Sequence, residues 1–435
     1  MSGTGYRAPD AVRRRGPNTE YRRPARPLEN AHIGFASRIL ASMAILLVGY
    51  SVRMIAELAV RAGYDVFALD YFGDADLRAL CPGLSLRHDF GDRPYDPKTL
   101  VRIAAALDHP AVVYGANLEN HPDLVARLAR GRRLLGNTPA TLRDVRDPFR
   151  VGDVLRSAGR AFPETLPAVP VDRPRPGERW LLKPLRSGGG HAVRFWTGGA
   201  VPVGTVLQAY RPGMVGSAVF VADGRRAVLL GVTEQLIGRQ AFGARDFRYC
   251  GNLVPPRRAP DELVALIDEA RAVAAVLTEA FGLRGVNGID FVWSEGRLWT
   301  IEVNPRPPAS LEPLEKVYGY RTFDFHVRAF DGDLPAFDLT HAERRVPAAG
   351  KAVLYATETL TVGNTSDWIR RGIRDVPHPG ESIPQGRPVC TLHAVGPSPA
   401  SCLRRLRYRA RWVRSRRDAA LSKGDPLRGS DGVTE

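Results

Sequence analysis

Residues 285–308 form two β-rich stretches that flank a short polar turn, and two carboxylates and a carboxamide, Asp290, Glu302 and Asn304, lie along them. A three-residue loop at 294–296 would make this segment a hairpin in which Asp290 lies opposite Thr300. Because side chains alternate along a strand, one face of the hairpin would carry Asp290, Thr300, Glu302 and Asn304. Asp290 would then lie diagonally across from Glu302, close enough to share one ion. Oxygen ligands of this kind suit Mg²⁺, or the similar ion Mn²⁺, held together with the phosphates of a nucleotide.

The opposite face of this hairpin is apolar and is expected to join a core. Its members are Ile289, Phe291, Trp293, Trp299, Ile301 and Val303. No histidine or cysteine is interleaved with the acidic residues, which argues against zinc. A solvated hairpin face is the alternative, and for a single Asp or Glu it is the commoner case. Here the second arm ends in Asn304-Pro305-Arg306, and a cation directly after an acidic strand end favours a site where anions and metals meet.

A second group of chemically useful residues lies in the segment 180–196, which predicts a strand, a glycine-rich turn and a second strand. Lys183 ends the apolar run of the first strand. The turn then contains Ser187, Gly188, Gly189 and Gly190. Backbone amides of such a turn can close on an anion, and a neighbouring lysine supplies a point charge, so the segment predicts phosphate binding. Glycine-rich hairpin tips also occur without this function, and the spacing excludes a GxxxxGK[ST] loop.

The residues before this segment predict a parallel α/β domain. Apolar periodicity between Ala44 and Asp70 indicates a strand, a helix capped by Ser51, and a second strand. Gly49 stands alone where a dinucleotide-binding fingerprint needs G-x-G-x-x-G, which argues against a dinucleotide site. Ligands of open parallel sheets bind at the carboxyl ends of the strands. Arg53 and Glu119 are therefore candidate substrate contacts, with ordinary surface positions as the alternative.

Changes in composition divide the chain into five parts. They are a disordered Arg- and Pro-rich extension (1–42), a Rossmann-like domain (43–140), an α+β domain (141–337), a small β-rich C-terminal domain (338–417) and a disordered tail (418–435). The C-terminal domain ends in a strongly basic amphipathic helix over 400–417. Such a helix could face nucleic acid, but a solvated helix face is the preferred interpretation.

The overall composition is that of a globular protein, with 44% hydrophobic and 25% charged residues. A formal charge of +16 raises the question of nucleic acid, but only five of the 62 basic residues are lysine and many arginines lie near the two ends. No RNP-like, zinc-finger or helix-turn-helix signature occurs, so nucleic acid is not the expected partner. Four cysteines without a CxxC pair, and apolar runs too short for a bilayer, predict a cytoplasmic protein without a membrane span.

Taken together, these features resemble the ATP-grasp superfamily. The resemblance is carried by Lys183 with the glycine turn, the strand over 206–210 and the acidic hairpin, in the family's order along residues 43–337. It implies a Rossmann-like pre-ATP-grasp domain, a two-subdomain ATP-grasp fold and a small C-terminal β-rich domain. The C-terminal part looks like that of biotin carboxylase-like members, and the chain is most similar to a predicted ATP-dependent carboligase group related to biotin carboxylase.

The resemblance also implies roles for individual residues. ATP would lie between the two subdomains, with Lys183 at its α- and β-phosphates and the turn 187–190 folded over them. The implied adenine hinge is Gln208, Ala209 and Tyr210, and the implied Mg²⁺ ligands are Asp290, Glu302 and Asn304. Members usually offer a second lysine before the glycine turn, which Arg146 or Arg150 would have to replace, and Arg150 is the predicted cofactor contact. Members also usually carry a hinge glutamate, where this chain has Gln208.

The implied reaction transfers the γ-phosphoryl group of ATP to a carboxylate, and an amine then attacks the acyl phosphate to give an amide, ADP and phosphate. Lys183 would neutralise charge during the transfer. Arg306 would steady the acyl phosphate, with a structural ion pair as its alternative role. The predicted partners are a small-molecule acid, an amine and a second copy of the chain in a homodimer. Alternative functions are a biotin-carboxylase-like reaction with bicarbonate and a non-catalytic nucleotide-binding or RNA-associated protein.

Overall fold

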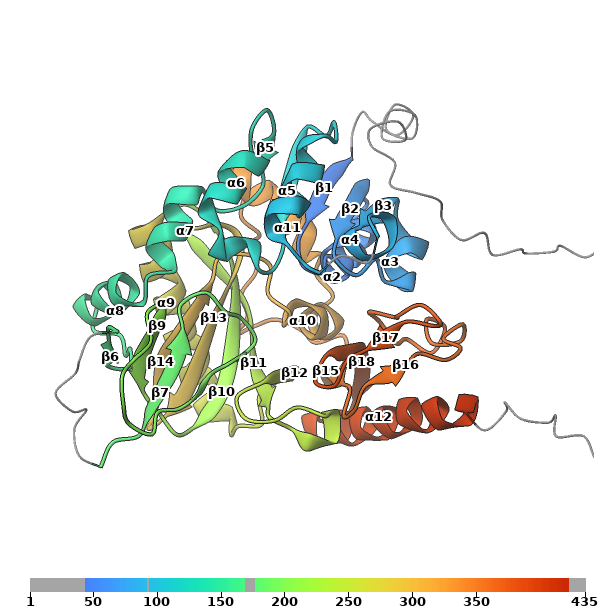
Figure 1. The fold of residues 1–435 in the computed structure, drawn as a ribbon. Coiled ribbons are helices and arrows are strands. Elements are labelled where there is room, and N and C mark those ends of the chain that lie inside the picture. Colours follow the sequence, from blue (N-terminus) through green and yellow to red (C-terminus); the bar gives the residue numbers. More distant parts are fainter. Residues whose placement is uncertain (1–43, 92–93, 169–176, 422–435) are drawn as a thin grey trace, which may run out of the picture.

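A computed structural model describes residues 44–91, 94–168 and 177–421 of the chain (Figure 1). The predicted extension, 1–42, and most of the predicted tail, 418–435, lie outside the described residues. Figure 1 shows the N-terminal α/β part above two antiparallel sheets, with helix α10 (Leu311–Tyr318) between the upper and lower parts. Within the described ranges, no helix is long and apolar enough to span a bilayer.

The N-terminal sheet is parallel and has the strand order β3-β2-β1-β4-β5. Its strands are β1 (Ile45–Val48), β2 (Val66–Asp70), β3 (Gly83–Ser85), β4 (Ala111–Tyr114) and β5 (Arg133–Leu134). Its helices are α2 (Arg53–Arg61), α3 (Ala75–Leu80), α4 (Leu86–Asp89), α5 (Pro97–Ala105) and α6 (Pro122–Leu128), with the 3-10 turn η1 (Leu118–Asn120) after β4. Alternate residues of β1 belong to two different apolar cores, which is why this strand is apolar throughout. The predicted Rossmann-like unit is confirmed.

The predicted cap of helix α2 was wrong. The N-cap is Val52, not Ser51, and it has no side-chain cap. Instead, the backbone N–H of Val52 donates to Oδ2 of the buried Asp70 at 3.2 Å. Asp70 ends β2, so a carboxylate from the neighbouring strand satisfies a donor that the sequence pattern assigned to a local hydroxyl.

The rest of the structure is built on antiparallel sheets, of order β14-β13-β10-β11-β12-β15-β18 and β6-β9-β7-β8. The large sheet consists of β10 (Met214–Asp223), β11 (Ala227–Ile237), β12 (Tyr249–Val254), β13 (Arg284–Ser294), β14 (Arg297–Asn304), β15 (Ala348–Tyr355) and β18 (Pro388–Gly396). The small sheet consists of β6 (Thr165–Leu166), β7 (Trp180–Pro184), β8 (Arg194–Phe195) and β9 (Thr205–Ala209), and β16 (Leu360–Thr361) pairs with β17 (Ser382–Ile383). Because β12 pairs with β15, the large sheet continues across the boundary predicted at residue 337.

Helices connect and cover these sheets. They are α7 (Pro139–Val145), α8 (Pro148–Ser157), α9 (Pro260–Phe281), α10, α11 (Thr322–Arg328) and α12 (Pro399–Leu421), with the 3-10 turns η2 (Gln240–Phe242) and η3 (Ala329–Asp331). The basic helix α12 runs past its predicted end at Arg417. Its apolar residues Cys402, Leu406 and Ala410 are buried in a core shared with β15 and β18.

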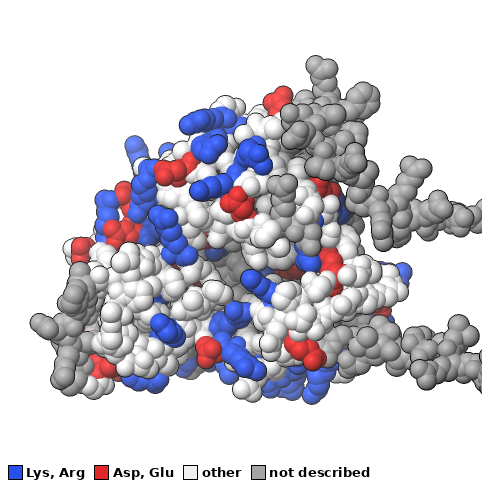
Figure 2. Space-filling view, in the orientation of Figure 1, with Lys and Arg blue, Asp and Glu red and all other residues white. Residues whose placement is uncertain are grey.

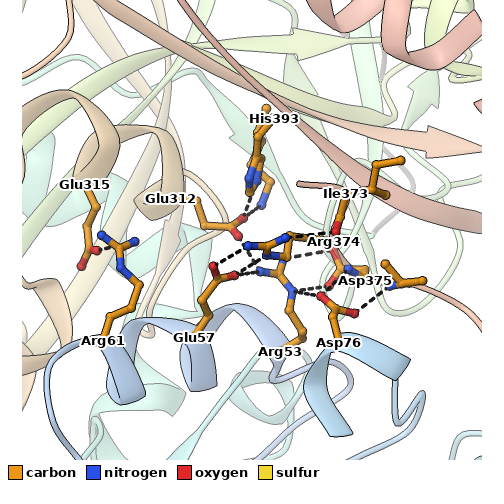
Figure 3. A network of polar contacts seen from close by, with 12 residues as sticks. Arg53, Glu57, Arg61, Asp76, Glu312, Glu315, Ile373, Arg374, Asp375 and His393 are labelled. Atoms are coloured by element: carbon orange, nitrogen blue, oxygen red, sulfur yellow. Dashed lines mark hydrogen bonds and ion pairs between the residues drawn. The ribbon is translucent and has the colours of Figure 1, made fainter. Parts of the chain in front are cut away.

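Arg53 on α2, predicted as a candidate substrate contact, lies instead in a buried ion-pair network (Figure 3). Its side chain is 2% exposed, and it donates to Glu312 at 2.6 Å and to Asp375 at 2.8 Å. Burial disfavours the charge of Glu312, but Arg53 and Lys351 hold the pKa of Glu312 well below its ordinary value. The side chain turns toward Glu312 on α10 and toward Asp375. The network therefore joins the N-terminal sheet to α10 and to the segment around Asp375.

Replacement of Arg53 should destabilise the whole fold. Arg53→Met leaves the buried carboxylate of Glu312 and the partly buried carboxylate of Asp375 without their guanidinium, so we expect the free energy of unfolding to fall by about 3–5 kcal/mol. Arg143→Met is the control, because Arg143 and its partner Asp123 are 55% and 89% exposed and such pairs contribute at most about 1 kcal/mol. Urea denaturation of the three proteins measures the difference. Equal stability of the two variants would contradict a structural role for the network.

Candidate functional site

A cavity of about 400 Å³ lies between the small and the large antiparallel sheets, within the size range of small-molecule sites. Strands β7 and β9 form one wall, strands β10 to β14 form the other, and residues of α7 and α8 contribute to the lining. Lys183 and Gln208 enter it from the small sheet, and Asp290 and Glu302 enter it from the large sheet. The fold therefore brings the lysine and the hairpin carboxylates together. Figure 2 shows basic and acidic side chains interspersed around a hollow between the upper and lower parts of this face.

Asp290 and Glu302 are direct cross-strand neighbours on β13 and β14. The hairpin turn has two residues, Glu295 and Gly296, with φ of 53° and 70°, so the predicted three-residue loop was wrong. Two positive φ angles in succession are typical of the tight turn that matches strand twist. The prediction that the two carboxylates share one face is confirmed, although they face each other directly rather than diagonally.

A β-bulge between Asp290 and Phe291 changes which residues follow the carboxylates. Thr300 lies opposite Phe291 and is fully buried, so its predicted place on the acidic face was wrong. Ile301, predicted to be core, lines the cavity instead. Trp299, also predicted to be core, is partly exposed and lies under the guanidinium of Arg211, 4.4 Å from its ring centroid. One extra residue in a strand reverses the faces of the residues beyond it, which explains all three corrections.

The two carboxylates repel each other inside the cavity. Asp290 accepts hydrogen bonds from Gln235 at 2.8 Å and from Asn304 at 3.1 Å, yet burial and the charge of Glu302 raise the pKa of Asp290 to about 6. Glu302 accepts a hydrogen bond from Arg146 at 2.6 Å. Burial opposes the charge of Glu302, but the guanidinium holds its pKa below the ordinary value. A divalent cation would relieve the repulsion, and this oxygen-only donor set fits Mg²⁺.

Lys183 faces the carboxylate pair from β7. Its ammonium donates to Oε1 of Gln208 at 2.9 Å and to the backbone oxygen of Ile301 at 3.0 Å. Burial lowers the pKa of Lys183, while the charge of Glu302 opposes that shift. Gln208 in turn donates to Oγ1 of Thr165 at 3.2 Å. The side chain of Gln208 therefore bridges Thr165 and Lys183, and its oxygen accepts one hydrogen bond from the lysine ammonium.

Arg146, at the end of α7, is the cation bonded to Glu302. Besides that carboxylate, its guanidinium donates to Oδ1 of Asn120 at 3.0 Å and to the backbone oxygen of Ser187 at 3.3 Å. It therefore contacts the acidic hairpin, the N-terminal domain and the glycine turn at once. Arg146 is one of the two residues that the sequence offers as a replacement for the second lysine of the family.

Arg150, the predicted cofactor contact, does not line the cavity. It lies in the first turn of α8, its side chain is 57% exposed, and it pairs with Asp144. Arg146 is the C-cap residue of α7, whereas Arg150 lies on α8, which begins at Pro148, so the two side chains face different surroundings. Spacing along the chain could not distinguish them.

Arg306 follows β14 and lines the same cavity. It donates to Oε1 of Glu119 at 2.7 Å and to Oδ1 of Asn304 at 3.2 Å. Glu119 is buried after β4, so this ion pair joins the N-terminal sheet to the hairpin. The structural ion pair expected as the alternative role of Arg306 is present, and the residue still borders the cavity. The side-chain oxygen of Asn304 already accepts from Arg306, so Asn304 contacts Asp290 through its amide nitrogen.

The glycine turn is held against the opposite wall. The backbone N–H of Tyr249 donates to the oxygen of Gly189 at 3.0 Å. Gly190 adopts φ of 70°, and a Cβ there would lie 1.9 Å from the backbone oxygen of Phe247. Only glycine fits this position, because any side chain would push the turn away from the wall. Ser187 and Gly189 also line the cavity, whereas Gly188 does not.

The predicted hinge residues Ala209 and Tyr210 line the cavity as well. The ring of Tyr210 packs edge-on against Phe195, with centroids 5.1 Å apart, and Phe195 packs against Phe247 at 5.2 Å. Gln235 and Phe247 had no assigned role in the sequence. They lie on β11 and before β12, and only the antiparallel arrangement of the sheet brings them to the site.

Residues 145–310 match a family model described as the ATP-grasp domain. In sequence, the chain is 22% identical over 376 residues to an uncharacterized protein of Methanocaldococcus jannaschii, covering 80% of this chain and 87% of that protein. The biotin carboxylase domain of Hydrogenobacter thermophilus 2-oxoglutarate carboxylase, solved with MgADP, ADP and bicarbonate, has a TM-score of 0.64 at 14% identity and covers 88% of this chain and 90% of its own. The L-amino acid ligase from Bacillus licheniformis has a TM-score of 0.62 at 13% identity and covers 85% and 97%.

The architecture is thus that of an ATP-grasp protein, with a parallel α/β domain followed by antiparallel sheets around a cavity. Residues 145–310 of the chain form an ATP-grasp domain. The structural likeness at these identities establishes the fold. The roles of individual residues in the cavity remain predictions.

Substitution of Gly190 tests whether the position of the turn matters for ligand binding. Gly190→Ala combines a positive φ with the clash at Phe247, so we expect about 1–3 kcal/mol of strain and a roughly tenfold or greater loss of ATP affinity. Gly204→Ala is the control, because Gly204 also has a positive φ of 81° but nothing within 4 Å of a Cβ. Equilibrium binding of a fluorescent ATP analogue measures the affinity. If the two variants bind alike, the clash with Phe247 does not govern the site.

Proposed function

We propose that the protein is an ATP-dependent carboxylate-amine ligase that forms an amide through an acyl phosphate. The observation that carries this proposal is the opposed pair of Asp290 and Glu302, which faces Lys183 and Arg146 within one cavity. Two carboxylates for a metal and two cations for phosphates are what phosphoryl transfer from a nucleotide requires. The L-amino acid ligase with the same fold supports a reaction of this class.

The cavity offers a position for each part of ATP. The base would lie beside Ala209 and Tyr210, which line the cavity on the small-sheet side. Lys183 would contact the phosphates, and the glycine turn would cover them. Asp290 and Glu302 would hold Mg²⁺, which supplies positive charge to the phosphates when bound.

The proposed reaction has two steps. A carboxylate oxygen of the acid attacks the γ-phosphorus while the bond to the β-phosphate oxygen breaks, which releases ADP. A neutral amine then attacks the acyl carbon, the bond from that carbon to the phosphate oxygen breaks, and the proton lost by the amine leaves with the phosphate. Lys183, Arg146 and Arg306 border the space from different elements, and each is held by a hydrogen bond to a protein oxygen. Because these cations are already positioned, little reorganisation is needed as charge moves.

Arg306 would contact the activated acid. It is held between Glu119 after β4 and Asn304 at the end of β14, where the N-terminal domain meets the hairpin. An acyl phosphate formed at the metal-bound phosphate would lie near this guanidinium. The glycine turn, held against the opposite wall by Tyr249, would keep water from the acyl phosphate until the amine arrives.

A bicarbonate-dependent carboxylase is the second candidate. The biotin carboxylase domain that shares this fold was solved with MgADP and bicarbonate. Bicarbonate is a small carboxylate, so the same residues could activate it as carboxyphosphate. A non-catalytic nucleotide-binding protein would use the cavity for ATP without turnover, and an RNA-associated protein would depend on the basic helix α12 and bind RNA in a salt-sensitive way.

Release of ADP separates these functions. We expect ADP only when a carboxylic acid and an amine are both present, in a screen of small acids and amines with Mg²⁺. Lys183→Met and Glu302→Gln should each lower the turnover at least about 100-fold, because each removes a group that stabilises the transferred charge. Lys98→Met and Glu279→Gln are matched controls at exposed positions and should keep wild-type turnover.

Each outcome of this screen has one meaning. ADP release with bicarbonate alone would replace the ligase by the carboxylase. Tight ATP binding without turnover, together with salt-sensitive RNA retention, would favour the non-catalytic alternatives. Unchanged turnover in both Lys183→Met and Glu302→Gln would remove the assignment of the site.

A further inference from the structure

Away from the cavity, three side chains able to bind a metal meet where the N-terminal sheet contacts the C-terminal part of the chain. His88 lies on α4, and His378 and Glu381 lie in the segment just before β17. Each offers one ligand atom, and these atoms lie within 4.8 Å of one another. Among the residues that the structure describes, they are the one group of three or more His, Cys, Asp or Glu side chains with this spacing.

Hydrogen bonds orient the ring of His378 for metal binding. Its Nε2 lies 2.8 Å from the backbone oxygen of Gly73, so Nε2 carries the proton and donates it. Nδ1 is then left with a lone pair. The backbone N–H of His378 donates to Oε1 of Glu381 at 3.0 Å, so this carboxylate lies beside His378, and one ligand atom of each residue lies within 4.8 Å of the other. A histidine whose second ring nitrogen donates to a backbone carbonyl is the usual arrangement at metal sites.

Contacts with Arg87 and His88 orient the carboxylate of Glu381. Its Oε2 pairs with Arg87 at 2.9 Å, while its Oε1 lies 3.2 Å from Nε2 of His88. The ion pair with Arg87 fixes the carboxylate, and Oε1 lies between the imidazole of His88 and the backbone N–H of His378. The side chain of His88 is 28% exposed, so an ion can reach the group from solvent.

We propose that His88, His378 and Glu381 form a second metal site, which binds Zn²⁺ with a water molecule as fourth ligand. Two imidazoles and one carboxylate around a position open to solvent are a typical zinc donor set. The pair of Asp290 and Glu302 differs from it, because that pair offers only oxygen and suits Mg²⁺. The two sites therefore select different metals by ligand chemistry.

The ligands belong to parts of the chain that are far apart in sequence. The same junction already holds a hydrogen bond from Arg87 to the oxygen of Ser382 at 3.0 Å and one from Ala75 to the oxygen of Val376 at 2.8 Å. A bound zinc ion would add a coordinate cross-link between α4 and the segment before β17. Zinc would then stabilise the folded state, because the unfolded chain does not hold these ligands together.

Zinc titration of the full chain without an affinity tag tests this site. The protein is first treated with a chelator, and saturating Mg²⁺ is then kept present so that oxygen-only sites are occupied. We expect calorimetry to show one zinc ion per chain. His88→Gln and Glu381→Gln should each weaken zinc binding roughly tenfold or more and should remove the rise in melting temperature that zinc produces in the wild type.

Two controls keep the test specific. His341→Gln changes an exposed histidine that pairs with Asp338 outside the group and should bind zinc as the wild type does. Glu302→Gln should also retain zinc binding, since the acidic hairpin is a separate site. Far-UV circular dichroism without zinc checks that all four variants are folded.

Several results would overturn the proposal. They are the absence of a stoichiometric zinc ion in the wild type, unchanged affinity in both His88→Gln and Glu381→Gln, and loss of zinc only in Glu302→Gln. The proposal does not depend on the ligase reaction, because the readouts are zinc affinity and melting temperature rather than turnover.

Discussion

The direct pairing of Asp290 with Glu302 puts two negative charges side by side inside a cavity, and the surrounding structure compensates for them. Arg146 bonds to Glu302, and the amides of Gln235 and Asn304 bond to Asp290. Even so, burial and repulsion leave the pKa of Asp290 raised to about 6. The uncompensated negative charge of this pair favours binding of a divalent cation, and a cation bound there would favour binding of phosphates. The proposed chemistry follows from that electrostatic constraint.

The cations of the site are held by parts of the chain that come from different domains. Arg306 bonds to Glu119 at the end of the N-terminal sheet, and Arg146 bonds to Asn120 next to it. Below them, the buried network around Arg53 and Glu312 fastens α2 to α10. The N-terminal domain therefore does more than cover the cavity. It fixes the arginines that the hairpin carboxylates need, so the geometry of the site depends on how the domains are joined.

Local patterns in the sequence were enough to predict the elements but not their exact partners. Alternation along the hairpin predicted that Asp290 and Glu302 share a face, since that follows from strand geometry alone. The two-residue turn and the bulge depend on backbone angles at Glu295 and Gly296 and on packing around Phe291, which composition does not reveal. The sequence could not tell which of Arg146 and Arg150 contacts Glu302, because the break between α7 and α8 decides it. Gln235 joins the site only through sheet topology.

Anomalous diffraction from crystals of the protein with Mn²⁺ and a non-hydrolysable ATP analogue tests whether Asp290 and Glu302 hold the metal ion that binds the nucleotide. Mn²⁺ replaces Mg²⁺ at oxygen sites and can be located by its own signal. We expect a manganese peak at coordination distance from carboxylate oxygens of both Asp290 and Glu302, with the phosphates beside Lys183. A nucleotide bound elsewhere, or a manganese ion that contacts neither carboxylate, would contradict this expectation.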